Sequence, residues 1–284
     1  AALSRPTVAL AVAVGGHGEH TLADLERAAR AEVIAYEGER IRFTHPLLAS
    51  TLYTEAPLGQ RRQLHRRLAE LVTDGEERAR HLALAADGPD LRVAAALEEA
   101  ATHAHLRGAP DAAAGLCEQA CALTPADRQG ERRRRTMEAA SYHLLAGNTS
   151  RARLLLEEAV SSVPPGAERA RLLQRLGQVH YHEDSWATAE ELLTQALAEA
   201  GDHPLLRCEI EQGLSFARQV RGDIPAAAAR ARAALELAEQ AADPRLVSES
   251  LVLVSLYEFL LGHGIRGDLM ERAAMLEEPT AAAQ

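Results

Sequence analysis

Residues 172–197 carry the sequence LLQRLGQVHYHEDSWATAEELLTQAL, and this stretch decides the fold. Small or apolar residues recur at the three- and four-residue spacing of a helix face, first over 173–180 and then over 189–196. Gly177 and Ala189 are small, so the backbones of the two helices can approach closely there. The neighbouring leucines, among them Leu193, then fill the seam between the helices. The stretch therefore predicts two antiparallel helices joined by a tight turn.

The same arrangement recurs from residue 89 to the end of the chain. Its turns are marked by Gly108, Gly147, Asp184, Gly222 and Gly262, at spacings of 39, 37, 38 and 40 residues. Pro125, Pro164, Pro204 and Pro244 lie between the units, where a helix must stop. The pattern resembles the tetratricopeptide repeat, which is about 34 residues long. We therefore predict about five repeats over residues 89–284, with longer helices or loops, although the fifth loses its register around Gly264 and Gly267.

Stacked helix pairs form a solenoid in which the first helix of each pair lines the inner face. In the repeat register this face carries amides, one arginine and two aromatic rings, at Arg171, Gln174, Gln178, Tyr181, Gln212, Phe216 and Gln219. Amides beside an aromatic ring suit a groove for a ligand or a partner protein. The alternative is a solvated surface that contributes some packing between repeats. Both interpretations stay open from the sequence alone.

Residues 1–88 lack the repeat and form a separate predicted domain. Helices are predicted over 7–14 and over 21–30, where Thr21 is a candidate cap. The segments 33–36 and 40–43 flank a Gly-containing turn, which predicts a β-hairpin. Two helices followed by a hairpin form the outline of a winged helix. The expected fold is thus all-α, with a small winged-helix-like domain and one hairpin ahead of a tetratricopeptide-like α-solenoid.

A winged helix raises the question of DNA binding. Six arginines lie on the candidate surface, at Arg40, Arg42, Arg61, Arg62, Arg66 and Arg67. Direct readout needs base-contacting side chains on a helix that enters the major groove, and no such pattern is visible. The net charge of −10 also argues against a nucleic-acid-binding chain. The basic run 132–135 is interpreted as a solvated helix start.

Three segments resemble a known family of regulators. They are IRFTHPLL from Ile41, RRQLHRRLA from Arg61 and ERARHLALAA from Glu77. The segments are similar to the large ATP-binding LuxR-type transcriptional regulators of actinobacteria. In that family a STAND-class ATPase ends in a winged helix, tetratricopeptide-like repeats follow, and a C-terminal helix-turn-helix binds DNA. The resemblance implies that His45 senses nucleotide by reaching the β-phosphate of ADP, and that ATP or ADP is bound by the parent protein.

The composition limits the chemistry that this chain can perform. It contains no lysine, so neither a P-loop nor a Schiff-base site exists in it. No GxSxG nucleophile motif is present. The pairs His103–His105 and His180–His182 are two residues apart and point in different directions on a helix, so no metal site is predicted. We therefore predict no enzyme and no bound cofactor in this chain.

These observations lead to two hypotheses. The first is the non-catalytic regulatory module of an ATP-dependent LuxR-type regulator. Its partners would be the ATPase core of the parent chain and an unknown inducer or protein on the inner face, with DNA bound only by a helix-turn-helix outside this sequence. The second is a free-standing tetratricopeptide-like scaffold for protein interactions.

Two further expectations concern the ends and the surroundings of the chain. Residues 251–261 are apolar nearly all round, so the array is expected to continue beyond this sequence. Three cysteines without metal or disulfide spacing favour buried thiols and a cytoplasmic location. The longest apolar run, 8–14, is too short for a membrane span, so no membrane partner is expected.

Overall fold

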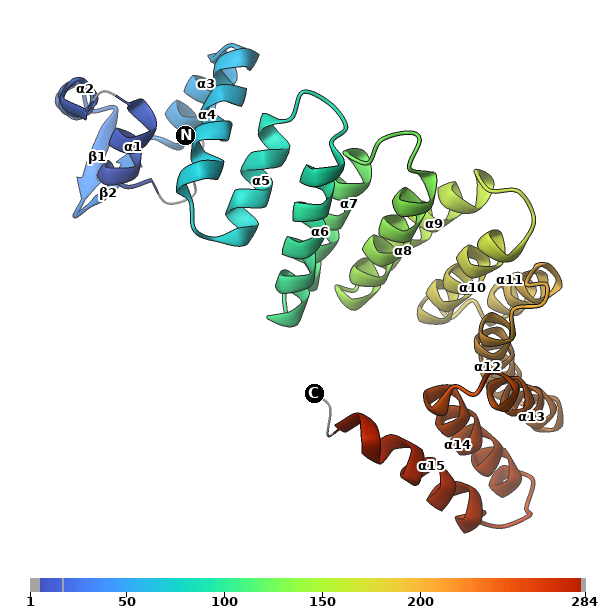
Figure 1. Cartoon of the computed structure of the whole chain (residues 1–284). Coiled ribbons are helices and arrows are strands. Elements are labelled where there is room, and N and C mark those ends of the chain that lie inside the picture. The colour runs from blue at the N-terminus through green and yellow to red at the C-terminus, as the bar shows by residue number, and fades with distance from the viewer. Residues whose placement is uncertain (1–5, 17, 282–284) are drawn as a thin grey trace. The chain divides into compact units, whose positions relative to one another are not determined.

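The computed structural model describes residues 6–16 and 18–281. Within these ranges the chain is helical apart from one two-stranded hairpin, which confirms the predicted all-α class (Figure 1). Residues 1–5, 17 and 282–284 lie outside the described part, and with them the first residues of the predicted domain 1–88 and the last residues of the predicted repeats 89–284. No helix of the described part is long and apolar enough to cross a membrane.

The N-terminal region has the connectivity of a winged helix. Helices α1 (Val8–Gly15) and α2 (Gly18–Arg30) precede strands β1 (Ile34–Glu37) and β2 (Arg40–Phe43). The strands pair antiparallel, with Ile34 opposite Phe43, around a turn in which Gly38 has a φ of +64°. The segment before α1 adds one isolated β-bridge, in which Thr7 lies opposite Arg40 and the N–H of Ile41 donates to the carbonyl of Pro6 at 2.9 Å.

The caps of the first two helices differ from the prediction. Thr7 caps α1, where its hydroxyl accepts from the N–H of Leu10 at 3.2 Å. Thr21 does not cap α2, because that helix already begins at Gly18 and Thr21 lies inside it. The turn between the helices is so tight that a Cβ added at Gly15 would collide with the Thr21 side chain. Thr21 therefore closes the turn from within the helix.

The remaining chain forms consecutive helices joined by short loops. They are α3 (Pro46–Glu55), α4 (Leu58–Leu71), α5 (Gly75–Ala85), α6 (Leu91–Leu106), α7 (Pro110–Ala122), α8 (Gln129–Leu145), α9 (Thr149–Ser161), α10 (Ala167–His182), α11 (Trp186–Glu199), α12 (Pro204–Val220), α13 (Ile224–Ala241), α14 (Pro244–Leu260) and α15 (Gly267–Ala281). The chain divides into two compact units, residues 1–135 and 136–284. Each unit is described by itself below.

In the N-terminal unit the helices α4 to α7 pack in sequence, each against the next. The predicted domain boundary between residues 88 and 89 falls in the loop between α5 and α6. These two helices nevertheless pack against each other, so the apolar contacts continue across that loop. The boundary at 88 stays a prediction about domain identity, while the compact unit extends to Arg135.

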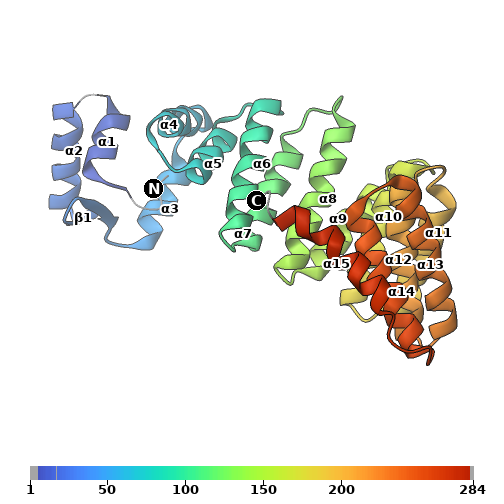
Figure 2. The ribbon, with the colours of Figure 1, turned by 60° about the horizontal axis from the view of Figure 1, so that its bottom comes forward.

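In the C-terminal unit the helices pair as α10–α11, α12–α13 and α14–α15, and each pair packs on the next (Figure 2). Leu193 of α11 is 1% exposed and lies at the centre of one apolar cluster. A Cβ added at Gly177 of α10 or at Gly213 of α12 would approach the Leu193 side chain to 3.1 Å. The predicted close approach at Gly177 is therefore present, and Gly213 repeats it on the following pair.

The five predicted turn residues all adopt the left-handed conformation. The φ angles are +81° at Gly108, +79° at Gly147, +55° at Asp184, +82° at Gly222 and +84° at Gly262. In each case the next residue donates its N–H back across the helix end, as Asp223 does to the carbonyl of Arg218 at 3.0 Å. These are Schellman motifs, in which a left-handed residue ends the helix and satisfies its last carbonyls.

We predict opposite effects of substitution at two of these turns. Gly222→Ala should lower the free energy of unfolding by about 1 kcal/mol, because an L-residue pays to adopt positive φ. Asp184→Gly should raise it by a few tenths to about 1 kcal/mol, because the strain at Asp184 is removed. Urea unfolding followed by circular dichroism measures both. Since no atom lies within 4 Å of a Cβ built at Gly222, an unchanged stability of Gly222→Ala would contradict the conformational explanation.

The last helix pair is complete despite the sequence irregularity around Gly264. After the left-handed Gly262 and Gly264, α15 begins at Gly267 and packs along α14. Leu251 and Tyr257 of α14 are fully buried. The opposite side of α14 is exposed, so the apolar run 251–261 is covered on one side within the described residues.

The basic run 132–135 is solvated only in part, which corrects the sequence interpretation at Arg135. Arg135 is only 2% exposed and donates to Glu98 of α6 and to the hydroxyl of Thr124, at 2.9 and 2.8 Å. Arg134 donates to the same carboxylate at 2.9 Å. These hydrogen bonds, above all those from Arg134, hold the pKa of Glu98 below its ordinary value. The run thus joins α8 to α6.

Glu98→Ala should lower the free energy of unfolding of the N-terminal unit by about 3 kcal/mol, because it removes the nearer carboxylate of the buried Arg135 guanidinium and leaves Glu131 at 3.5 Å. The neighbouring exposed Glu99 is the matched control, and Glu99→Ala should change stability by less than about 0.5 kcal/mol. Chemical unfolding of both variants compares them directly. Equal effects would show that the pair with Arg135 adds nothing to stability.

Candidate functional site

The inner face of the C-terminal unit is formed by α10, α12 and α14, the first helices of three successive pairs. The predicted groove residues occupy equivalent positions on the first two. Gln174 corresponds to Gln212, and Tyr181 corresponds to Gln219, each 38 residues apart like the turns at Asp184 and Gly222. The structure therefore places these side chains on adjoining helices, as the repeat register requires.

Three of the predicted groove residues bridge neighbouring helices. The Tyr181 hydroxyl donates to the carbonyl of Gly213 at 2.7 Å, joining α10 to α12. Gln212 Nε2 donates to the Ser250 hydroxyl at 3.0 Å, and Gln219 Oε1 accepts from Tyr257 at 3.0 Å, joining α12 to α14. These polar groups stabilise the array. The sequence left open whether these side chains bind a partner. A partner that did bind them would have to compete with these hydrogen bonds between helices.

The other four predicted residues differ in accessibility. Gln174 is buried, whereas Gln178 is half-buried and accepts from Arg175 at 3.0 Å. Arg171 and Phe216 are exposed. Of the predicted groove, Arg171, Gln178 and Phe216 are thus the side chains that offer surface to a partner.

Phe216 belongs to a cluster of three aromatic rings. Tyr181 stacks on Trp186 with ring centroids 5.4 Å apart, and Phe216 meets both rings edge-on at 5.7 Å. Such edge-to-face pairs contribute beyond simple burial. Trp186, the first residue of α11, packs here against both other rings. Because two rings support it, the 42% exposed Phe216 is held in one place.

Two arginines share one buried carboxylate beside this cluster. Glu190 of α11 is 8% exposed and pairs with both Arg218 and Arg221 of α12 and its C-terminal end. Burial, and secondarily the charge of Glu190, raise the pKa of the Tyr181 hydroxyl, so Tyr181 stays a neutral donor. Arg218 also lies 3.5 Å from Asp223, so two carboxylates, Glu190 and Asp223, face the two guanidinium groups beside the aromatic cluster.

The repeat register extends to residues that the sequence interpretation did not assign to the inner face. Val252, Leu256 and Phe259 lie 40 residues after Gln212, Phe216 and Gln219. All three are exposed on α14. The spacing of 40 residues between Gly222 and Gly262 was the sequence pattern that could have assigned these three residues to the inner face. The apolar run around them instead suggested a helix buried on both sides.

His45, the predicted nucleotide sensor, caps α3. Its Nδ1 accepts from the N–H of Leu47 at 3.2 Å, and Pro46 occupies the first helical position. The ring is exposed. His45 thus has a local capping role, and the sensing role stays a prediction that the described residues do not test.

A buried histidine pair lies in the N-terminal unit. His65 and His81, at 1% and 4% exposure, approach each other through their Nδ1 atoms at 3.0 Å. The Tyr53 hydroxyl is 2.7 Å from His65 Nε2. One Nδ1 must donate and the other accept, so at least one of the two rings must be neutral. Burial lowers the pKa of both histidines; the charges of His81 and then of Arg61 add to the effect at His65, and Glu77 opposes it at His81.

The N-terminal unit should lose stability as the pH falls below 6.5, the ordinary histidine pKa. A lowered pKa in the folded state means that the unfolded chain binds more protons in this window, so unfolding is favoured by acid. Urea unfolding at a series of pH values measures the slope. His81→Leu should flatten it. The Glu98 carboxylate, whose pKa is lowered, titrates below this window. A stability independent of pH between about 7 and 5 would contradict the buried-pair assignment.

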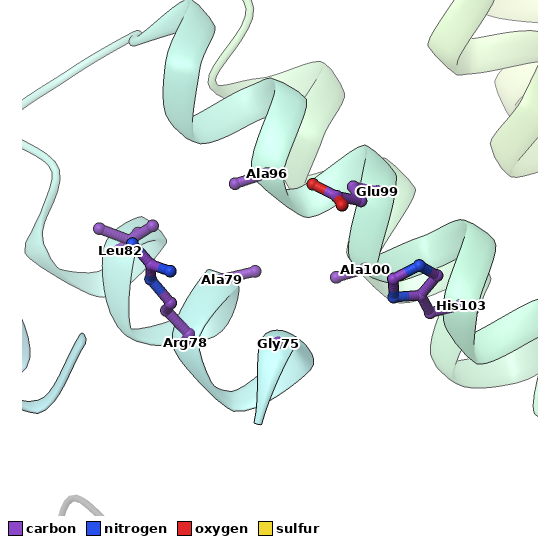
Figure 3. Close-up of a pocket in the computed structure, with 8 residues that line it drawn as sticks. All are labelled: Gly75, Arg78, Ala79, Leu82, Ala96, Glu99, Ala100 and His103. Carbon is purple, nitrogen blue, oxygen red and sulfur yellow. The ribbon is translucent and has the colours of Figure 1, made fainter. Parts of the chain in front are cut away.

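A small hollow of about 310 Å³ lies between α5 and α6 (Figure 3). Ala79 and Ala100 form part of its floor, and Arg78, Glu99 and His103 stand at its rim. The three ionisable side chains are exposed, so water solvates them. The hollow therefore has no buried polar group to orient a ligand, which binding sites generally provide.

Nor do the described residues contain a cluster of three or more metal-binding side chains. His180 lies 3.7 Å from Glu183, which also pairs with Arg153. Cys117 and Cys208 are buried thiols, whereas Cys121 is partly exposed. Burial raises the pKa of Cys208 to about 11, which leaves it protonated and unreactive at neutral pH.

The winged-helix-like region does not present a basic face for DNA. Helix α2, in the position of a recognition helix, carries Glu19, Asp24 and Glu26, and its Arg27 and Arg30 pair with two of these carboxylates. Four of the six arginines of the candidate DNA surface are also engaged elsewhere. Arg42 pairs with Glu37, Arg62 and Arg66 pair with Asp87, and Arg67 donates to the carbonyl of Val14.

Comparisons with solved structures support the solenoid. The repeats of a protein from Podosopora anserina named as a kinesin light chain, with tetratricopeptide-like repeats, align with a TM-score of 0.52 and 18% identity over 66% of this chain and 96% of that one. BtubC from P. vanneervenii aligns with a TM-score of 0.53 and 14% identity over 80% of this chain and 91% of that one. No protein-family model matches the sequence, and no curated protein shows significant similarity. The fold is therefore a tetratricopeptide-like helical solenoid.

Proposed function

We propose that this chain is a non-catalytic protein-binding module, and that its partner docks on the inner face around Phe216. The observation that carries the proposal is an exposed aromatic ring that packs edge-on against Tyr181 and Trp186. Rigid aromatic anchors contribute much of the affinity at protein interfaces. The tetratricopeptide-like fold, which provides an extended inner surface, supports the same function.

The charges around the anchor indicate the chemistry of the partner. Glu190 and Asp223 already face Arg218 and Arg221, whereas Arg171 is exposed on the adjoining helix α10. A partner segment with an apolar side chain for the aromatic cluster and an acidic side chain for Arg171 fits this surface. The guanidinium group favours such a carboxylate because it binds it through two parallel hydrogen bonds.

Selection of phage-displayed random peptides on the full chain tests this proposal. Enriched peptides should combine acidic and apolar residues, and Phe216→Ala should weaken their binding about 10-fold. Phe259→Ala is the matched control, because it removes another exposed phenylalanine of the same array and should leave binding unchanged. Peptides that bind Phe216→Ala as tightly as the unmodified chain would place the binding surface elsewhere.

We also propose the narrower function that the sequence resemblance suggests, a regulatory module of an ATP-dependent LuxR-type regulator. Its support is the winged-helix-like connectivity and the exposed His45. In this proposal the ATPase core of the parent protein binds ATP or ADP and contacts His45. A ligand on the inner face would shift the regulator between two states, which requires different affinities for each.

The reading frame upstream of Ala1 separates this narrower function from a free-standing scaffold. A P-loop encoded just before Ala1 supports the regulator, whereas a start codon at that point supports the scaffold. An electrophoretic mobility assay with duplex DNA tests the remaining alternative. Because α2 is acidic and the nearby arginines are paired, we expect no salt-sensitive binding by this chain alone.

A further inference from the structure

Two exposed arginines of α10 differ from most arginines of the C-terminal unit. Elsewhere in this unit a guanidinium group typically lies on a carboxylate, as that of Arg230 does on Glu211. Arg175 instead donates to the neutral amide oxygen of Gln178 at 3.0 Å. Within the described residues neither Arg171 nor Arg175 forms an ion pair with a carboxylate. Both guanidinium groups are therefore available to an anion from outside the chain.

The two guanidinium groups can reach the same anion. Arg171 and Arg175 are four residues apart on one helix, which places their Cβ atoms about 6 Å apart on one face. Gln178 follows on the same face, so its bond to Arg175 keeps that guanidinium over the inner surface. Like charges at this spacing repel each other. An anion held between the two groups would relieve that repulsion.

The neighbouring helix α12 provides open space opposite Arg175. Its equivalent residue, 38 positions later, is Gly213, which has no side chain. Phe216 follows three residues after Gly213, on the next turn of α12. Adjoining helix axes lie about 10 Å apart, a distance that about three residues of an extended peptide cover. One peptide can thus contact the arginine pair and the exposed Phe216 together.

We infer that the partner segment carries a phosphorylated serine or threonine, which Arg171 and Arg175 bind together. The inference rests on the proposed function, because it places the phosphate next to the residue that packs on Phe216. A carboxylate has one charge and two oxygens, so a single guanidinium group satisfies it through two parallel hydrogen bonds. A phosphate monoester has nearly two charges and three acceptor oxygens. It therefore matches two guanidinium groups.

The charge of the remaining surface favours a single phosphate over an extended polyanion such as nucleic acid. The chain has a net charge of −10, and the first helices of the next two pairs carry Glu209 and Glu249. These carboxylates already pair with Arg245. A long row of phosphates would meet this acidic surface, whereas one phosphate needs only the arginine pair of α10.

Peptide arrays probed with the full chain test the inference. The arrays carry phosphoserine, aspartate or serine at a fixed central position between random flanking residues. We expect the chain to select phosphoserine peptides that have an apolar residue within about three positions of the phosphate. In fluorescence anisotropy, the phosphoserine form of a selected peptide should bind about 10-fold more tightly than its aspartate form.

Three arginine variants locate the phosphate. Arg171→Gln and Arg175→Gln should each remove most of the gain from phosphoserine, because one guanidinium group then faces the dianion alone. Arg272→Gln is the matched control, because it removes the same charge from an exposed arginine of α15 whose partner is Glu239. It should leave the gain unchanged. Circular dichroism checks that the variants keep their helices.

Equal affinity for phosphoserine and aspartate peptides would overturn the inference, as would a gain that survives both α10 variants. Displacement of the peptide by a single-stranded oligonucleotide at equal phosphate concentration would also overturn it, by showing a general polyanion surface. These results leave the proposed function intact provided that Phe216→Ala still weakens binding of the aspartate peptides. If Phe216→Ala binds every peptide as tightly as the unmodified chain, the proposed docking surface is wrong, and the inference is overturned with it.

Discussion

The C-terminal unit depends on the position of one buried leucine between two glycines. Leu193 contacts Gly177 within its own helix pair and Gly213 on the next, so one side chain sets two interhelical distances. A Cβ at either glycine would crowd that side chain at 3.1 Å. The leucine therefore couples the packing inside a repeat to the packing between repeats. The bridge from Tyr181 to the Gly213 carbonyl forms at the same place, because no side chain separates the two helices.

Arginine–carboxylate pairs provide a second set of links between helices. Glu199 binds Arg169 across α10 and α11, Glu190 binds Arg218 across α11 and α12, and Glu211 binds Arg230 across α12 and α13. In each pair the carboxylate is the more buried partner. The guanidinium lies over it with part of its surface in water. A chain without lysine is suited to this arrangement, since the planar guanidinium donates several hydrogen bonds in a fixed geometry.

The same repeat register serves both structure and recognition. Where the inner positions carry Gln212 and Gln219, they bond to the next helix and hold the array together. Phe216, between them, points outward and keeps its ring accessible. On α14 the corresponding positions, Val252, Leu256 and Phe259, are all apolar and exposed. The same repeated geometry therefore gives the last helix pair a more apolar inner surface than the pair before it.

The sequence by itself determined the helix pairs, their turns and the hairpin. It did so because left-handed glycines, small seam residues and a two-residue alternation are local patterns, as Gly222 and Gly177 illustrate. The position of the inner face also followed from the register. Only the tertiary structure decided which inner residues are free, which histidines are buried together and that Arg135 is enclosed by Glu98 and Thr124. Burial and pairing depend on what a helix some 15 to 40 residues away contributes, and local spacing does not encode that contribution.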